Sequence, residues 1–410
     1  MNVRTASVIL AAGALLAGCS GGPSRSEDPA VPVPPDIEPD IQQGNINNLW
    51  TQKPSDADLK AAARARETNP NRPTQWWPEI SRKPDSFYRS AEGRRMAENI
   101  LSWQYQGTGW PLMNTTREAN TGDPAQAGPW GVRAALIKAT VNEMRFLARG
   151  YRATQDERYK QAVLGGLNFI LAAQYPSGGW PHSYPVHRTE YSRYATFNDD
   201  MMPDLMTLLQ EVTSSPDFAF VGDENRKRVR DANARGLDFI LRTQIRSNGR
   251  LTAWAQQYDE VTYEPRPARV FEPVAISGGE SASVLMYLMS LKRPSPEVIA
   301  AVEAGVQWYR DAQIDGLRLT QTSDDRIVTP DPAAPPIWAR FYDIQTGRPI
   351  FVGRDGVIRD RLADIDQERR GGYAWYNYNG TKVFERHAEW TYERKRDAQP
   401  PTNVDESKAG

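Results

Sequence analysis

Three arginines in a segment near the C-terminal end of the chain suggest a carboxylate-binding loop. Arg340, Arg348 and Arg354 occur there without helical spacing. Guanidinium groups bind carboxylates bidentately, so this segment favours an acidic sugar as its ligand. A long ordered loop inside a compact domain usually has a function. The alternative is that these arginines brace the loop by pairing with acids of the same segment.

Two adjacent acids, Asp199 and Asp200, form a second candidate site. They come directly before Met201 and the apolar positions of an expected helix. Adjacent carboxylates suit a hard cation such as calcium, which takes oxygen ligands. An acid at this position is also a good helix N-cap, which would explain one of the two without any ligand. The sequence leaves both interpretations open.

Other catalytic chemistries lack the residues that they need. The spacing of the three histidines (His182, His187 and His387) does not match a metal site. Cys19 is the only cysteine, which excludes an internal disulfide and cysteine-based metal sites. The net charge is −1, so a bulk attraction to nucleic acid is not expected. Catalysis must therefore rest on carboxylates, arginine, lysine or tyrosine.

The elements that would position these residues follow an internal repeat. Gln104, Gln174, Gln244 and Gln313 end similar apolar segments and are spaced 70, 70 and 69 residues apart. Gly-Trp-Pro follows the first two. A fixed period indicates repeated supersecondary units, and this period accommodates a pair of helices with functional loops. The loops after the repeated glutamines would then lie on one face and form one groove.

Apolar positions at helical spacing predict a helix pair in each repeat. No series of hairpin-spaced strands is evident. We therefore expect an all-α fold, an irregular α/α toroid of antiparallel helix pairs with long groove-forming loops. Most of the twelve tryptophans are expected in its core, although flat rings in a groove could also stack on a sugar. The expected helices cover residues 132–151, 159–174, 201–212, 229–244, 281–291 and 296–313.

The N-terminal residues are typical of an exported, lipid-anchored protein. The apolar stretch Val8 to Leu16 is too short to span a bilayer and indicates a signal peptide. Leu-Ala-Gly-Cys at 16–19 resembles a bacterial lipobox, which predicts lipidation of Cys19. Ser20 follows, so we expect an outer-membrane lipoprotein on its periplasmic or cell-surface face. The expected organisation is a signal peptide (1–18), a polar tether (19–73), one catalytic domain (74–396) and a polar tail (397–410).

Six motifs that occur in order make the chain similar to a known family. Over about residues 75–390 it resembles the pectate lyases of polysaccharide lyase family 10. The resemblance implies calcium-assisted β-elimination on polygalacturonate or a related acidic polysaccharide, on a fold related to the α/α toroid. The motifs are Gln174 to Pro181, Thr196 to Asp200, Trp254 to Asp259, the Pro-Ala-Arg at Arg269, Ser277 to Ser281, and Arg340 to Gly356.

The resemblance also implies roles for individual residues. Arg354 would be the base that removes the C5 proton, and Arg340 and Arg269 would hold substrate carboxylates. Asp199 and Asp200 would hold calcium. A divalent cation and guanidinium groups can neutralise the enolate charge that develops beside C5. Substrate binding is further assigned to Arg348, Trp180, Trp254 and Asp259.

A departure from the family's pattern leaves other functions open. The family's Asp-Asn-Gly-Ala-Thr corresponds here to residues 136–140, so Leu136 replaces an acid, and Lys138, which we expect to be solvated, lies nearby. This change motivates a non-catalytic glycan-binding lipoprotein as an alternative. A third possibility is an inverting glycoside hydrolase, with Asp199 and Asp259 roughly 6.5–9.5 Å apart. A monomer is expected in each case.

Overall fold

The structure is a computed structural model that describes residues 76–111, 115–122, 135–186, 191–322 and 324–397, all within one compact unit. The signal peptide, Cys19, the tether and the tail after residue 397 lie outside these residues, and their assignments stay predictions. None of the described helices has the length and apolar character that crossing a membrane would need.

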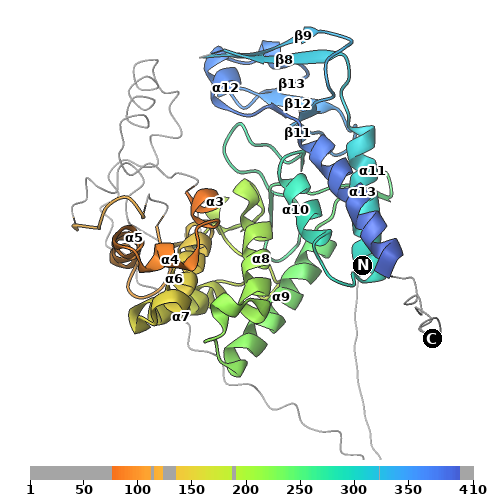
Figure 1. Cartoon of the computed structure of the whole chain (residues 1–410). Coiled ribbons are helices and arrows are strands. Elements are labelled where there is room, and N and C mark those ends of the chain that lie inside the picture. Colours follow the sequence, from red (N-terminus) through yellow and green to blue (C-terminus); the bar gives the residue numbers. More distant parts are fainter. Residues whose placement is uncertain (1–75, 112–114, 123–134, 187–190, 323, 398–410) are drawn as a thin grey trace, which may run out of the picture. The chain divides into compact units, whose positions relative to one another are not determined.

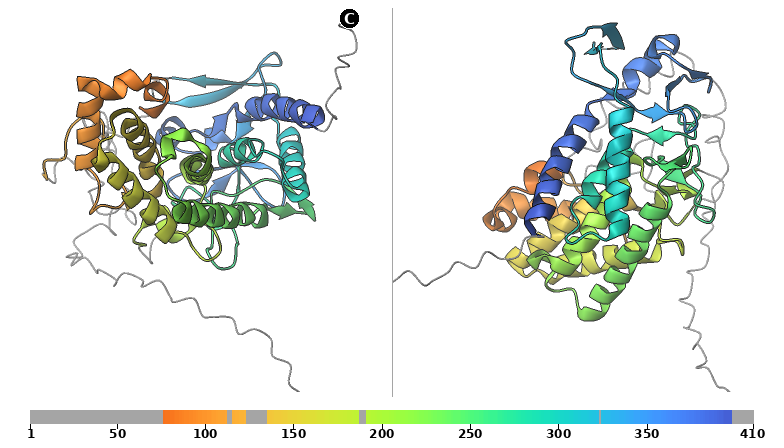
Figure 2. Two further views of the ribbon diagram at one scale, coloured as in Figure 1. Left: turned by 60° about the horizontal axis from the view of Figure 1, so that its bottom comes forward. Right: turned by 90° about the vertical axis from the view of Figure 1, so that its right-hand side faces the viewer.

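Two rows of helices build the described part of the chain (Figures 1 and 2). One row contains α6 (Ile137–Thr154), α8 (Met201–Ser214), α10 (Glu280–Leu288) and α13 (Asn379–Asp397). The other contains α5 (Ala91–Ser102), α7 (Glu157–Ala172), α9 (Asp223–Arg242) and α11 (Pro296–Asp311). Shorter helices are α3 (Trp77–Ile80), α4 (Asp85–Arg89) and α12 (Gln367–Gly372).

Consecutive helices pack against each other across the two rows: α6 on α7, α8 on α9, and α10 on α11. The sequence explains where several of them begin. Asp156 caps α7 by accepting a hydrogen bond from the backbone of Arg158, and Ser295 caps α11, whose first residue is Pro296. Each of the six helix ranges expected from apolar spacing overlaps one of the helices α6 to α11.

The expectation of an all-α toroid is wrong, because short antiparallel strands connect the helices. Most of these strands have two residues, too few for an alternating pattern to be recognised in the sequence. The hairpin of β8 (Leu317–Gln321) and β9 (Arg326–Pro330) is longer and is half exposed. The other two-stranded sheets pair β1 (Ala135–Leu136) with β2 (Ser183–Tyr184), β3 (Ala195–Thr196) with β6 (Gln257–Tyr258), β4 (Arg246–Ser247) with β5 (Arg250–Leu251), and β10 (Trp338–Ala339) with β14 (Tyr376–Asn377).

A four-stranded sheet, rather than a long loop, carries the arginine-rich segment. Phe341 pairs with Ile350 on one side and with Ser277 on the other. The sheet lies with α12 at one end of α11 and α13 (Figure 1). It holds the backbone beside Arg340 and just before Arg354, so both side chains start from fixed positions. The strand order is β13 (Ile358–Arg359), β12 (Pro349–Val352), β11 (Phe341–Tyr342) and β7 (Ile276–Ser277).

The repeated glutamines hold neighbouring repeats together. The Nε2 of Gln244 donates to the carbonyl oxygens of Thr252 and Ala301, both at 2.9 Å, and so ties the end of α9 to its own loop and to α11. Gln174 and Gln104 make the same two kinds of bond, one and two repeats earlier. The fourth glutamine departs from this pattern, because its Nε2 binds the carboxylate of Asp315.

A buried tryptophan after each glutamine makes a second repeated contact. Its indole Nε1 donates at 2.8 Å to the backbone carbonyl four residues before the repeated glutamine. That carbonyl belongs to the last turn of a helix, where backbone acceptors lack intrahelical donors. The donor and acceptor pairs are Trp110 with Ile100, Trp180 with Ile170, Trp254 with Ile240, and Trp338 with Tyr309.

Replacing Gln244 by alanine should lower the free energy of unfolding by about 1–3 kcal/mol, because the two hydrogen bonds that tie the end of α9 to Thr252 and Ala301 are lost. The matched control is Gln313→Ala, which removes an exposed contact with Asp315 and should change stability by less than about 0.5 kcal/mol. Chemical denaturation followed by circular dichroism measures both values. Equal losses in the two variants would show that the repeated bond does not hold the repeats together.

Candidate functional site

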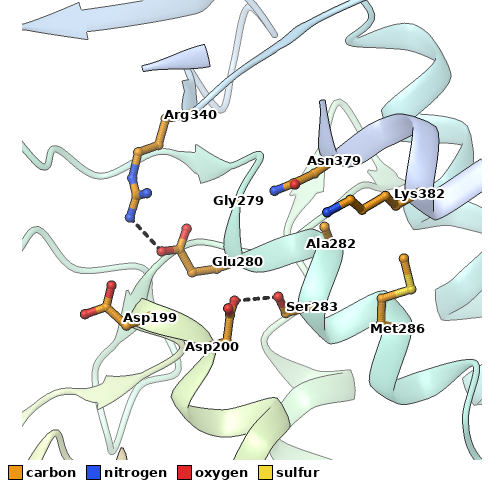
Figure 3. Close-up of a pocket in the computed structure, with 10 residues that line it drawn as sticks. All are labelled: Asp199, Asp200, Gly279, Glu280, Ala282, Ser283, Met286, Arg340, Asn379 and Lys382. Carbon is orange, nitrogen blue, oxygen red and sulfur yellow. Dashed lines mark hydrogen bonds and ion pairs between the residues drawn. The ribbon is translucent and has the colours of Figure 1, made fainter. Parts of the chain in front are cut away.

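A pocket of about 330 Å³ is lined by residues from four separate parts of the chain (Figure 3). These parts are the 3-10 helix Asn198–Asp200, α10 with the residue before it, the link between β10 and β11, and the first turn of α13. Side chains of both charge signs therefore face one space. The lining residues are Asp199, Asp200, Gly279, Glu280, Ala282, Ser283, Met286, Arg340, Asn379 and Lys382.

The backbone of Asp199 and Asp200 is strained. Their φ angles are +54° and +61°, in the left-handed region that residues other than glycine rarely adopt. Asp200 is the N-cap residue of α8, yet its side chain makes no capping hydrogen bond and instead accepts one from Ser283. Burial raises the pKa of Asp200. Helix capping therefore does not explain this acidic pair, and the strain points to a function.

The carboxylates of the pocket differ in their existing partners. Glu280 accepts hydrogen bonds from Arg340 at 2.8 Å and from Gln256 at 3.2 Å. Asp199 is exposed and accepts one from the neighbouring Asn198 at 3.1 Å. The acidic pair offers the hard oxygen donors that calcium prefers. Within the described ranges no group of three or more His, Cys, Asp or Glu could hold a metal, so a cation here would need further oxygens from substrate and water.

Three arginine–glutamate ion pairs hold the guanidinium groups of the site. Only the pair of Arg340 with Glu280 joins segments that are far apart in the sequence, because Arg269 and Glu272 are three residues apart. Arg269 and Arg354 each bind their glutamate through both Nε and Nη2. The acids of the arginine-rich segment do not take this role, since Asp355 pairs with Arg359. The pairs are Arg269 with Glu272, Arg340 with Glu280 and Arg354 with Glu368, at N–O distances of 2.5–3.0 Å.

Two aromatic rings, Phe271 and Tyr373, gather these guanidinium groups and a fourth one, that of Arg369. The Cζ atoms of Arg269, Arg354 and Arg369 lie 4.9, 5.3 and 4.3 Å from the centroid of Phe271. Those of Arg340 and Arg369 lie 4.6 and 5.1 Å from the centroid of Tyr373. Guanidinium groups pack favourably on aromatic faces. We call Arg269, Arg340, Arg354 and Arg369 the arginine cluster.

Burial and pairing oppose each other in the arginine cluster. Burial alone would lower the pKa of Arg269 and of Arg340, but their glutamate partners outweigh burial and raise both pKa values. These guanidinium groups are therefore held in the protonated form. Arg369 differs, because burial, followed by the charge of Arg354, lowers its pKa to about 10.

The arginine cluster and the acidic pair share one electrostatic environment. Burial lowers the pKa of His182, and the charges of Asp199 and Arg269 act on this imidazole in opposite directions. The charge of Asp199 also acts on Arg340. Residues predicted from three separate motifs are thus brought within electrostatic range of one another.

Four predicted substrate-binding residues lie outside this arrangement. Trp180 and Trp254 are fully buried, with their indoles bound to helix-end carbonyls, so the expectation that they contact substrate is wrong. Arg348 is exposed at the turn between β11 and β12. Asp259 accepts hydrogen bonds from the backbone N–H of Thr262 and its neighbour and from a side chain, and these donors lower its pKa. Asp259 thus stays ionised and closes a turn, unlike the general acid of an inverting glycoside hydrolase.

Asn379, Lys382 and Arg369 are among the residues of the site that sequence reasoning missed. Asn379 and Lys382 belong to α13, whose many charged positions resemble a solvated helix face. Arg369 belongs to α12, in a run of polar residues without a recognisable spacing. Lys138, which we expected to be solvated, forms an ion pair with Asp204. A contact made only in the fold leaves no local signal in the sequence.

Comparison with known proteins agrees with this geometry. The profile of the pectic acid lyase family matches residues 104–384. The structure of a family 10 polysaccharide lyase from Cellvibrio cellulosa is 31% identical with a TM-score of 0.65, and the match covers 75% of this chain and 95% of that one. A mutant family 10 lyase from the same organism, in complex with trigalacturonic acid, is 31% identical with a TM-score of 0.66, covering 75% and 96%. A search of curated proteins gave no significant match.

The family profile covers more than half of the chain, and the solved lyases align along nearly their whole length. These matches confirm the resemblance predicted from the six motifs. The chain belongs to the pectic acid lyase family and is a polysaccharide lyase.

Proposed function

We propose that this lyase cleaves polygalacturonate or a related uronate glycan by β-elimination, with the pocket of Figure 3 and the arginine cluster as its active site. The observation that carries the proposal is the gathering of guanidinium groups around Phe271 and Tyr373, within electrostatic range of Asp199. The family member that holds trigalacturonic acid supports a polyuronate as the substrate.

The reaction needs positive charge at the substrate carboxylate. β-Elimination removes the proton on C5, next to the carboxylate carbon, and breaks the bond between C4 and the glycosidic oxygen. The charge that develops on the carboxylate is stabilised by donors already in place. Arg340 suits this role, because it lines the pocket and its Glu280 partner helps to raise its pKa, which keeps the guanidinium charged. We assign Arg340 to the substrate carboxylate.

Arg354 is proposed as the base that takes the C5 proton. Its guanidinium must then leave Glu368, because a bidentate carboxylate stabilises the protonated form. Arg269 is a second candidate, since it shares the electrostatic environment of Asp199 at His182, and its guanidinium must likewise leave Glu272. In either case the neighbouring guanidinium groups of the arginine cluster favour loss of the proton.

Calcium is the proposed cofactor, and Asp199 and Asp200 would hold it. When bound, it would neutralise negative charge on the substrate carboxylate. The described residues contribute two acids rather than a closed cage, so we expect weak calcium binding until substrate supplies further oxygens. Lys138 is engaged with Asp204 and is given no part in the reaction.

A lipid on Cys19 is proposed to anchor the mature protein, as a monomer, to the outer membrane. The lipobox-like residues 16–19 support this assignment. Mass spectrometry of the mature N-terminal peptide should find an acylated Cys19. An unmodified cysteine, or cleavage at another position, would contradict the assignment.

The purified protein should form unsaturated uronate product from polygalacturonate, measured by ultraviolet absorbance, and a chelator should reduce the rate to background. Asp199→Asn should raise the calcium concentration for half-maximal rate by about tenfold or more, because it removes a charged ligand. Asp223→Asn, at the exposed start of α9, is the matched control and should change nothing. Equal rates with calcium and with chelator would rule out the calcium assignment.

Replacing Arg354 or Arg269 should separate the base from a carboxylate-binding residue. Loss of the base should lower kcat by about 100-fold or more with little change in KM, whereas loss of a carboxylate contact should mainly raise KM. Alanine variants of both, assayed on polygalacturonate, provide the comparison. Arg361→Ala, which removes an exposed ion pair with Asp364, is the control. An unchanged kcat in both variants would exclude these two arginines as the base.

A further inference from the structure

Arg369 is the most deeply buried member of the arginine cluster. Only 5% of the residue is exposed, and its guanidinium lies closer to the centroid of Phe271 than that of Arg269 or Arg354. Tyr373 places it beside Arg340 as well, since both guanidinium groups contact this ring. Arg369 therefore lies beside Arg340, which is proposed to bind the substrate carboxylate, and beside Arg354 and Arg269, the two candidates for the base.

Unlike the other three members, Arg369 has no carboxylate partner. Its Nε is sealed from solvent without an acceptor, and no ion pair joins Arg369 to an acid in the part of the chain that the structure describes. The next residue shows the contrast, because Arg370 is held bidentately by Asp325 at 2.9 and 2.7 Å. Burial without a partner is therefore specific to Arg369 and not a property of α12.

The charges of the arginine cluster do not balance. Among the residues that the structure describes, ion pairs join three of the four guanidinium groups to glutamates, and Arg369 is the one without an ion pair among buried aromatic rings. A buried charge without a counter-ion is costly unless an ion of opposite sign approaches. The lowered pKa of Arg369 has the same origin, namely burial followed by repulsion from Arg354. A bound anion at the surface of the cluster would relieve this imbalance.

We propose that Arg369 is a specificity-determining residue, whose uncompensated charge makes the arginine cluster select a free uronate carboxylate over its methyl ester. This inference rests on the proposed function. The carboxylate binds the more accessible members of the cluster. Arg369 is buried behind them and attracts the carboxylate by its charge, without contacting it. A methyl ester keeps the shape of the uronate and can accept hydrogen bonds, but it brings no negative charge. The missing charge, rather than a missing contact, then decides between the two ligands.

The test compares the binding of trigalacturonate and its methyl ester by titration calorimetry, with KM and kcat on polygalacturonate and methyl-esterified pectin. Arg369→Gln should weaken trigalacturonate binding by about 10-fold or more and leave binding of the ester within about twofold. Arg370→Gln is the matched control on the same helix, and it should keep the wild-type preference even where its melting temperature falls. Arg369→Met provides a second neutral variant that retains the packing of the side-chain stem.

Arg369→Lys tests the charge separately from packing, because a purely structural role would not make the preference for the acid depend on pH. Its ammonium should retain the preference for the acid at pH 7. The same burial and repulsion should lower the pKa of a lysine at this position, so the preference should fade as the pH rises toward 9. The wild-type arginine should keep its preference over this range.

Folded Arg369→Gln and Arg369→Met proteins that keep the wild-type preference would overturn this inference alone and leave Arg369 as a packing residue. A wild-type protein that binds and cleaves neither ligand would overturn the proposed function, and this inference with it. Equal loss of binding for acid and ester in the neutral variants would also overturn the inference, because it would show a general loss of the site.

Discussion

A helix leaves its last backbone carbonyls without intrahelical donors, and burial makes an unsatisfied carbonyl costly. Four helices of this protein meet that constraint in the same way, with a buried indole from the following segment. Each following segment is therefore drawn back to the end of the helix that it leaves. The segment after Trp180 leads to Asp199, the one after Trp254 leads to Arg269, and Trp338 lies two residues before Arg340. The site is assembled where these segments meet.

Close packing between the two helix rows depends on the same repeat. A Cβ atom at Gly236 would lie 2.5 Å from the sulfur of Met206 and 3.0 Å from the ring of Trp180. The helix pair α8 and α9 can thus approach closely only because α9 has no side chain at this point. The indole of Trp180 donates to a carbonyl at the end of α7 and also packs between the two helix rows. The packing of the helices and the position of the following loop therefore depend on the same side chain.

The helices could be predicted from the sequence because their apolar stripes extend over several turns, as in α6 and α7. The strands could not, because a pair such as β3 and β6 is two residues long and is defined by its partner rather than by its own pattern. The arginine-rich segment looked like a loop for a related reason. Turns and charged residues in this segment obscure the pattern of two strands, β11 and β12. β11 is buried between β12 on one side and β7 on the other.

The site residues that could be predicted are those that belong to short motifs in the sequence. Asp199, Arg269, Arg340 and Arg354 stand in recognisable contexts, and the fold brings them together. The partner Glu280 of Arg340 could not be foreseen, because an ion pair between segments far apart in the sequence is set by three-dimensional distance. Glu272 is only three residues from Arg269, and this local pair was overlooked. Trp180 and Trp254 were assigned to the substrate since aromatic rings serve both sugars and cores, and only burial separates the two uses. Lys382 comes from a helix with no local mark of function.

The interval between the repeated glutamine and its tryptophan is six residues in the first two repeats, ten in the third and twenty-five in the fourth. In the fourth, Ile314 and Ile337 close the interval with two backbone hydrogen bonds at 3.0 Å, and the β8–β9 hairpin lies between them. Lengthening a loop whose ends are already joined costs little entropy. Evolution can therefore insert new structure into one interval at a time while the helix rows stay unchanged. Diversification of this architecture should be concentrated in these intervals.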